Sequence, residues 1–259
     1  MNSKIISKNN FKYIDEGSGH VIILLHGLMG SLSNFKKCIE ELPKKGFRVI
    51  MPLLPIYDLP LLKTSAGELS NFLNDFISEL NLNNFFLLGN SLGGHVGLIY
   101  TIQFQSKIKG LILTGSSGLY ENAMGGSFPK RGDYNFIKNK TEEVFYDPKC
   151  ADKHLVDEVF ETVNNRKKVI KILAMAKSAI RHNMRKELPK IKIPTCIIWG
   201  ENDKVTPPKV AKEFHDLISS SKLFWIKKCS HAAMMEHPKL FNKIILEWVH
   251  SLKNENQKN

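Results

Sequence analysis

Several patterns that would indicate a metal or a disulfide framework are missing from this sequence. Its four cysteines, Cys38, Cys150, Cys196 and Cys229, are far apart and form no Cys-x-x-Cys pair. This spacing offers no zinc site, and a disulfide framework would be unusual in a chain of 259 residues. We therefore expect four free thiols, a reducing compartment and no bound metal.

Long apolar segments and nucleotide motifs are also missing. The longest apolar runs, such as residues 21–25, have the length of a strand and are too short to span a bilayer. Residues 1–17 lack the apolar run of a secretory signal peptide, so we expect a cytoplasmic location and no membrane insertion. Neither G-x-G-x-x-G nor G-x-x-x-x-G-K-[ST] occurs, so we expect no nucleotide cofactor, and no other cofactor is required.

The charge is strongly basic, with a formal net charge of +12. Most basic residues are lysines spread along the whole chain, and no long basic run with interleaved aromatic residues occurs. We interpret the charge as a lysine-rich solvated surface and expect no nucleic-acid partner. The sequence does not predict the oligomeric state.

Apolar strand-like segments alternate with helical patterns along most of the chain. Strands are predicted at residues 11–15, 21–25, 47–51, 85–88, 110–113, 195–199 and 223–226, and helices at residues 33–42, 65–80, 91–103, 208–219 and 238–252. The continuous run at 21–25 is typical of a strand buried on both faces, whereas 11–15 is interpreted as an edge strand. The alternation predicts an α/β fold with a mostly parallel sheet and helices on both faces.

This alternation stops between residues 119 and 188, where no parallel strand is predicted. Helical patterns occur there at residues 141–145, 153–164 and 167–181. We therefore predict a core formed by residues 1–118 and 189–259, with residues 119–188 as a helical insertion in the same domain. Active sites of such sheets lie at the carboxyl ends of the strands, and an insertion over that end would form a lid or cap.

The candidate nucleophile is Ser91, within the sequence Gly-Asn-Ser-Leu-Gly at residues 89–93. This match to G-x-S-x-G is more specific than the motif alone, because a predicted strand precedes it and a predicted helix follows it. A nucleophile on such a sharp turn has a strained backbone, and the glycines remove side chains that would collide with it. The new helix also directs its positive end towards the site.

A serine hydroxyl needs a base, and the imidazole of that base needs a carboxylate to orient it. Among nine histidines, His231 is our candidate because it follows the last predicted strand. Asp203 follows the strand at 195–199 in the same way, and Glu201 is its local competitor. The order serine, aspartate, histidine is the one expected for this architecture.

Acyl transfer also needs N–H donors for the developing oxyanion. One candidate is the backbone N–H of Leu92, which follows the nucleophile. The second is the backbone N–H of Leu28, in the loop His26-Gly27-Leu28-Met29-Gly30 after the strand at 21–25. We expect His26 to order this loop by hydrogen bonding and assign it no catalytic role.

Four segments together resemble the α/β-hydrolase superfamily: LLHGLMG, LLGNSLGGHVGL, IIWGENDKVTPP and KKCSHAAMMEHP. They occur in the expected order and cover nearly the whole chain except the insertion. The resemblance implies the α/β-hydrolase fold, with a mostly parallel eight-stranded sheet, a Ser-Asp-His triad and a helical cap after the sixth strand.

The superfamily is chemically broad, so the fold does not name the reaction. Ser91 argues against haloalkane dehalogenases and most epoxide hydrolases of this superfamily, because these use an aspartate nucleophile. We predict a carboxylesterase-like serine hydrolase that forms an acyl-enzyme with a small carboxylic ester or thioester. One alternative is a carbon–carbon bond hydrolase of a vinylogous diketone, a group that shares GNS-x-GG. Another is a slow-turnover ligand sensor, like certain hydrolase-like hormone receptors.

Two features of the insertion leave alternatives open. Arg166, Arg181 and Arg185 lie in or beside its last helical pattern. Their guanidinium groups could bind a substrate carboxylate, although a solvated helix face is the simpler interpretation. Some apolar residues could line an acyl pocket or form the core of the insertion: Leu119, Phe128, Ile172, Met175 and Ile180.

Overall fold

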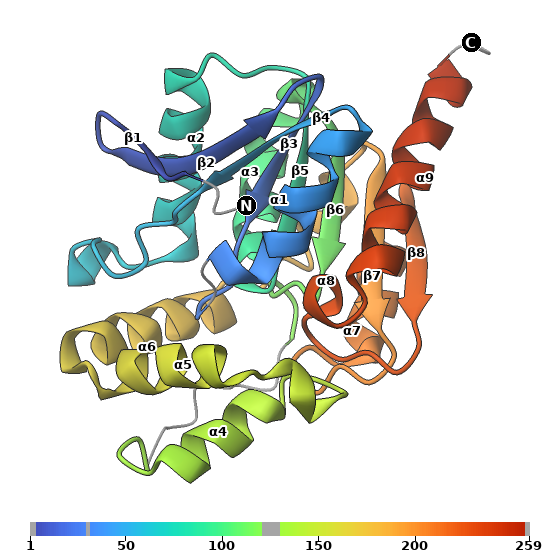
Figure 1. The fold of residues 1–259 in the computed structure, drawn as a ribbon. Helices are drawn as coiled ribbons and strands as arrows, with labels where there is room; N and C mark the ends of the chain where they lie inside the picture. The colour runs from blue at the N-terminus through green and yellow to red at the C-terminus, as the bar shows by residue number, and fades with distance from the viewer. Residues whose placement is uncertain (1–3, 30–31, 121–129, 257–259) are drawn as a thin grey trace.

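The computed structural model describes residues 4–29, 32–120 and 130–256, and these residues contain one eight-stranded sheet (Figure 1). Its strands are β1 (Ile6–Lys8), β2 (Phe11–Gly17), β3 (His20–Leu25), β4 (Phe47–Pro52), β5 (Phe85–Asn90), β6 (Ile108–Thr114), β7 (Thr195–Gly200) and β8 (Ser221–Ile226). The spatial order is β1-β2-β4-β3-β5-β6-β7-β8. Only β1–β2 and β2–β4 are antiparallel, which confirms the mostly parallel sheet.

The sequence pattern does not predict β1. This strand pairs with β2 and lies at that edge of the sheet. The prediction of an edge strand at residues 11–15 is therefore wrong. The three residues of β1 are half-buried or exposed, and they therefore show no apolar alternation. A short, polar edge strand is a common way to prevent further strand pairing.

Helices and short 3-10 helices connect the strands. The α-helices are α1 (Lys36–Glu41), α2 (Ala66–Glu79), α3 (Leu92–Phe104), α4 (Tyr134–Glu142), α5 (Lys153–Asn164), α6 (Arg166–Arg181), α7 (Pro208–Leu217), α8 (Ala233–Glu236) and α9 (Pro238–Asn256). The 3-10 helices are η1 (Leu32–Phe35), η2 (Pro43–Lys45), η3 (Leu61–Lys63), η4 (Gln105–Lys107), η5 (Pro148–Cys150) and η6 (Leu188–Lys190).

Two helix predictions need correction. The helix predicted at residues 141–145 lies earlier, as α4, because the Asp133 side chain caps it by accepting a hydrogen bond from the Phe136 N–H at 3.1 Å. The helix predicted at residues 33–42 is divided into η1 and α1.

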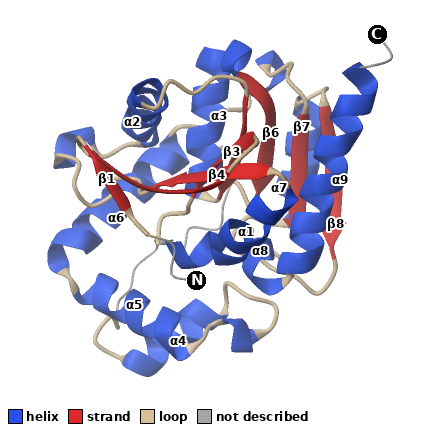
Figure 2. Ribbon diagram, turned by 45° about the horizontal axis from the view of Figure 1, so that its top comes forward, coloured by secondary structure: helices blue, strands red, loops and turns tan. Residues whose placement is uncertain are grey.

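Helices cover both faces of the sheet. In β3, Ile22 and Leu24 face the core that includes residues of α1, α8 and α9, whereas Ile23 and Leu25 face the core that includes residues of α2, α3 and α7. All four side chains are fully buried, which explains the continuous apolar run in this strand. Figure 2 shows the strands between α2 and α3 on one side and α1 and α8 on the other.

The helices α4, α5 and α6 between β6 and β7 form the helical insertion. They pack around a small core of their own that includes Ile137, Val159 and Val163. In Figure 1, the arrowheads of β6 and β8 point towards this insertion. The insertion therefore lies at the carboxyl end of the parallel strands.

The insertion is fastened to the core where it returns to the sheet. The Met184 N–H donates to the Gly118 carbonyl at 2.7 Å, so the outgoing and returning chains are joined. Nearby, His95 Nε2 on α3 lies 3.0 Å from His182 Nδ1 at the end of α6, and the two rings are stacked. Burial, together with a smaller contribution from the neighbouring His182 ring, lowers the pKa of His95 to about 3. His95 is thus a neutral, buried anchor for the insertion.

The predicted free thiols are confirmed for Cys38, Cys150, Cys196 and Cys229. Burial raises the pKa of Cys38 and Cys196 well above the ordinary thiol value, so both stay protonated. In the described part of the chain, no helix has both the length and the apolar character needed to cross a bilayer.

We predict that His95→Gln makes stability less dependent on pH. The unfolded chain binds a proton at His95 near pH 6.5, whereas the folded chain does so only near pH 3. Wild-type stability therefore falls as the pH drops through this window, by up to ~1.4 kcal/mol per pH unit from this group. Glutamine does not titrate, so urea unfolding followed by circular dichroism from about pH 7 to about pH 4.5 should give a shallower slope.

The control is His250→Gln on α9, because water reaches this exposed histidine in the folded and unfolded chains alike. This control should keep the wild-type slope. Equal slopes for His95→Gln and the wild type would contradict the prediction.

Candidate active site

Ser91 lies in the turn between β5 and α3. Its φ of 53° and ψ of −122° lie in a region that residues with a side chain rarely adopt, at a cost of order 1–3 kcal/mol. The Ser91 N–H donates to the Thr114 carbonyl at 3.2 Å. The Ser91 carbonyl accepts from the N–H groups of His95 at 3.2 Å and Ser117 at 3.1 Å. These backbone bonds hold the strained turn.

The glycines around Ser91 allow three chain segments to approach closely. A β-carbon on Gly93 would overlap the carbonyl oxygen of Leu25 on β3, and one on Gly89 would overlap the backbone of Gly93. Any other residue at these positions would force β3, β5 and α3 apart. We expected these glycines to avoid a collision with the serine itself, whereas the contacts that they avoid are with the backbone of Leu25 and of Gly93.

Asp203 and His231 are in direct contact. His231 Nδ1 lies 2.9 Å from Asp203 Oδ2, although 28 residues separate them in the chain. The Asp203 side chain is 0 % exposed and that of His231 is 7 % exposed. The local competitor Glu201 has an exposed side chain, so the structure favours Asp203 as the partner of His231.

The carboxylate of Asp203 is held by four hydrogen bonds. Its Oδ1 accepts from the N–H groups of Val205 at 2.8 Å and Thr206 at 2.9 Å. Its Oδ2 accepts from the Thr206 hydroxyl at 2.8 Å and from His231 Nδ1. An ionised carboxylate only accepts hydrogen bonds, so this contact assigns the proton of the neutral ring to Nδ1 of His231 and leaves Nε2 as the nitrogen that can act as a base.

Ser91 and His231 are linked through shared neighbours. The Asn90 side chain donates from Nδ2 to the carbonyl of Thr114 at 3.0 Å and to the carbonyl of His231 at 3.3 Å. The same Thr114 carbonyl accepts the Ser91 N–H. Gly115, directly after β6, lies against the His231 ring, because a β-carbon there would come 2.8 Å from Nδ1. The ends of β5, β6 and β8 therefore meet around the histidine.

The loop after β3 lies against the same turn. A β-carbon on Gly27 would come 3.2 Å from the β-carbon of Ser91. His26 orders this loop as expected: Nδ1 bonds to the Gly27 carbonyl at 2.9 Å, and Nε2 accepts the Leu54 N–H at 3.0 Å. Burial lowers the pKa of His26, which keeps the ring in this neutral tautomer.

The two candidate oxyanion donors flank Ser91. Leu92 begins α3, and Leu28 follows Gly27 in the β3 loop. Among the described residues, neither backbone N–H has a hydrogen-bond partner. The Leu92 N–H thus remains available at the positive end of α3, and the Leu28 N–H one residue after Gly27, which lies against Ser91.

The sequence did not indicate three residues that contact the predicted site residues Asp203 and His231. Thr206 lies three residues after Asp203, so the spacing Asp-x-x-Thr could have indicated a side chain that turns back to the carboxylate. Asn90 and Gly115 gave no such signal. Their contacts with His231 span more than 100 residues, 141 in the case of Asn90.

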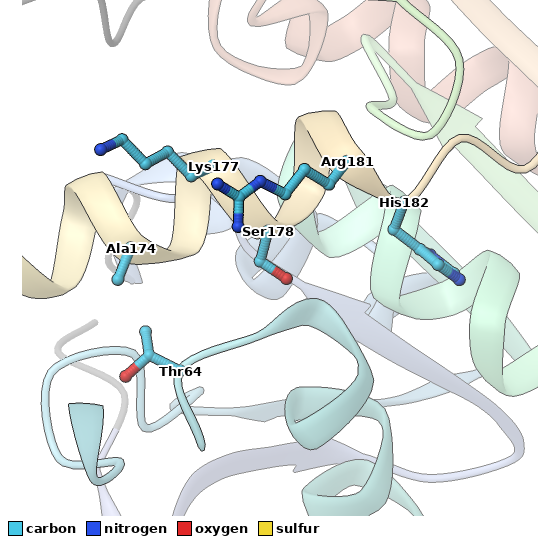
Figure 3. A pocket seen from close by; sticks show the side chains of 6 residues that line it. All are labelled: Thr64, Ala174, Lys177, Ser178, Arg181 and His182. Carbon is cyan, nitrogen blue, oxygen red and sulfur yellow. The ribbon is translucent and has the colours of Figure 1, made fainter. Parts of the chain in front are cut away.

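The arginines of the insertion lie in different surroundings. Arg185 pairs with Glu213 on α7, and Arg166 lies exposed in the first turn of α6. Arg181 lines a pocket of about 510 Å³ between α6 and the segment before α2 (Figure 3). This pocket is lined by Thr64, Ala174, Lys177, Ser178, Arg181 and His182. Its lining includes two basic residues, Lys177 and Arg181, and no carboxylate.

Most of the apolar residues considered for an acyl pocket pack inside the protein. Leu119, Ile172 and Met175 are buried. Ile180 is 49 % exposed, so it belongs to no core. Phe128 lies outside the described residues. The interpretation as packing residues is therefore the better one for the three buried side chains.

Comparisons with known proteins agree with this geometry. The chain matches the family model described as the alpha/beta hydrolase fold, over residues 20–173 and 164–238. It is 27 % identical to a 2-hydroxy-6-oxononadienedioate/2-hydroxy-6-oxononatrienedioate hydrolase of Pseudomonas putida, over 93 % of this chain and 92 % of the relative. It is 26 % identical to a 2-hydroxy-6-oxo-6-(2'-aminophenyl)hexa-2,4-dienoic acid hydrolase of Metapseudomonas resinovorans, over 92 % and 87 %.

Solved structures show the same architecture. An alpha/beta hydrolase enzyme from the sediment metagenome of the lagoon of Mar Chica, Morocco, is 46 % identical, with a TM-score of 0.79 over 96 % of this chain and 98 % of that one. A meta-cleavage product hydrolase from Pseudomonas fluorescens IP01, at 19 % identity, shares the fold with a TM-score of 0.81 over 93 % and 94 %. The strained serine turn, the sheet order and these matches lead to one conclusion: the chain belongs to the α/β hydrolase family.

Proposed function

We propose that this hydrolase cleaves a small carboxylic ester or thioester through an acyl-enzyme on Ser91. The observation that carries the proposal is the buried contact between Asp203 and His231, beside a serine held in a strained turn. In this assignment His231 is the general base and Asp203 orients it. The backbone N–H groups of Leu28 and Leu92 stabilise the oxyanion.

The geometry supports the following chemistry. Nε2 of His231 takes the Ser91 hydroxyl proton as Oγ attacks the substrate carbonyl, and the Asp203 charge stabilises the imidazolium. The carbonyl oxygen becomes an oxyanion between the N–H groups of Leu28 and Leu92. As the intermediate collapses, His231 returns the proton to the leaving alcohol or thiol. Water then attacks the acyl-enzyme, with His231 again as base, and releases the acid and Ser91.

We also propose that the helical insertion, residues 119–188, acts as a cap on the core formed by residues 1–118 and 189–259. Its position at the carboxyl end of the strands supports this role, because an insertion there can exclude water and select substrates. Its return to the core beside α3, through His182 and His95, places it next to the helix that begins after Ser91.

A carbon–carbon bond hydrolase is the second candidate. The observation in its favour is the similarity to the two curated relatives, whose names give hydrolysis of dienoic or dienedioic acids. Such substrates carry carboxylates, and Arg181 of the insertion lines a pocket. Cytoplasmic location and the absence of a nucleic-acid partner stay predictions.

We predict that Ser91→Ala abolishes turnover of p-nitrophenyl butyrate, with a loss on the order of 10⁶ in kcat, because alanine has no hydroxyl to form the acyl-enzyme. A panel of this ester, its thioester analogue and a vinylogous 1,5-diketone, each assayed with wild type and Ser91→Ala, separates the candidates. Fast, Ser91-dependent cleavage of the esters alone supports the esterase.

Fast cleavage of the diketone alone would replace the ester proposal with carbon–carbon hydrolysis. Turnover of only a few events per hour on every substrate would favour a ligand sensor. Undiminished ester turnover in Ser91→Ala would remove Ser91 from the mechanism altogether.

We predict that Thr206→Val lowers kcat about 10-fold, while Thr206→Ser keeps most of the activity. Valine has the shape of threonine but removes the hydroxyl that donates to Asp203 Oδ2, and a hydrogen bond to a charged group is worth roughly 1.5–3 kcal/mol. Steady-state assays with p-nitrophenyl butyrate measure the effect. If valine and serine gave the same kcat, the hydroxyl would have no role in orienting the pair.

We predict that Arg181→Gln raises KM for a p-nitrophenyl monoester of a dicarboxylic acid about 10-fold and leaves KM for p-nitrophenyl butyrate unchanged. The reason is that only the acidic substrate can use the guanidinium. Arg185→Gln is the matched control, since its guanidinium is already paired with Glu213. An unchanged KM for the acidic ester would leave Arg181 as part of a solvated helix face.

A further inference from the structure

Glu236 is a carboxylate that the proposed chemistry does not use. It is the last residue of α8, the short helix that follows His231. Unlike a typical surface glutamate, this residue is half-buried. Among the described residues, no lysine, arginine or histidine forms an ion pair with it. Its charge is therefore balanced by other donors.

One oxygen of this carboxylate holds the loop that carries His231. Glu236 Oε1 accepts the Ser230 N–H at 2.7 Å, one residue before the histidine. It also accepts the Cys229 thiol at 3.7 Å. Burial raises the pKa of Cys229, and the charge of Glu236 raises it further, so this thiol stays protonated as a donor. The loop 229–231 is thus hydrogen-bonded to Glu236 twice.

The other oxygen holds the helical insertion. Glu236 Oε2 accepts the Tyr146 N–H at 2.7 Å and the Asp147 N–H at 3.3 Å. These residues lie just after α4, about 90 positions away in the chain. Beside them, the Val144 carbonyl accepts the His231 N–H at 3.1 Å. The segment 144–147 and the loop 229–231 therefore share one clamp, with Glu236 at its centre.

We propose that Glu236 is a positioning residue that couples the insertion to the general base. It sets the place of His231 by holding the adjacent backbone, and it fixes that backbone relative to residues 144–147. This inference rests on the proposed role of His231. Hydrogen bonds from N–H groups to a carboxylate are directional and strong, so loss of one changes the position of the loop. Displacement of a catalytic group by about 1 Å can cost on the order of 10² in rate.

Glu236→Gln tests the proposal, because glutamine has the same shape but only one accepting oxygen. The NH₂ group of glutamine cannot accept a hydrogen bond. The side that it faces, either the loop 229–231 or the segment 144–147, therefore loses its hydrogen bonds to residue 236. We expect kcat for p-nitrophenyl butyrate to fall 10- to 100-fold with an unchanged KM, since Glu236 does not touch substrate. The control is Glu247→Gln on α9, an exposed residue that pairs with Lys243 and should keep wild-type kcat.

A second measurement separates positioning from general stability. Hydrogen–deuterium exchange of the intact variant should rise in segment 144–147, in segment 229–231 or in both, and stay unchanged in β3, β5 and β7. A uniform rise across the chain, or a lower kcat without faster exchange in these segments, would overturn the proposal. Wild-type kcat in Glu236→Gln, with Ser91→Ala inactive, would also overturn it while leaving the proposed function intact. Activity in Ser91→Ala would count against the function itself.

Discussion

The strained backbone of Ser91 is the constraint on which the rest of this structure depends. A residue with φ of 53° keeps that conformation only when its surroundings leave no alternative. Here β3 approaches from one side through the space left at Gly93, and β6 accepts the Ser91 N–H through Thr114. Close packing at the centre of the parallel sheet therefore offsets the cost of the strained backbone and holds the Ser91 hydroxyl at the edge of the sheet.

The same parallel arrangement collects the remaining groups. Each loop at this edge contributes a different part: Gly27 and Leu28 after β3, Gly115 after β6, Asp203 after β7 and His231 after β8. The bond between Asp203 and His231 joins the loops after β7 and β8, and Asn90 at the end of β5 bonds to Thr114 of β6 and to His231. The arrangement is therefore a connected network whose geometry depends on every strand end.

The insertion belongs to this network. At its return it is fastened to α3 through His95 and His182, one turn after Ser91. At residues 144–147 it bonds to the loop of His231 and to Glu236. A helical insertion joined to both sides of the site can influence the chemistry without supplying a reacting group, because a shift in its position moves the backbone beside the serine or the histidine.

The sequence alone determined the alternation of strands and helices and the candidate residues Ser91, Asp203 and His231, because these signals are local. Burial on both faces makes a strand continuously apolar, and the nucleophile turn needs its glycines within two positions of the serine. The polar edge strand β1 and the Asp133 cap of α4 were missed because neither changes the apolar pattern. Only the tertiary structure decided the contact of Asn90 with His231 and the clamp at Glu236, since those hydrogen bonds join residues that sequence spacing leaves independent.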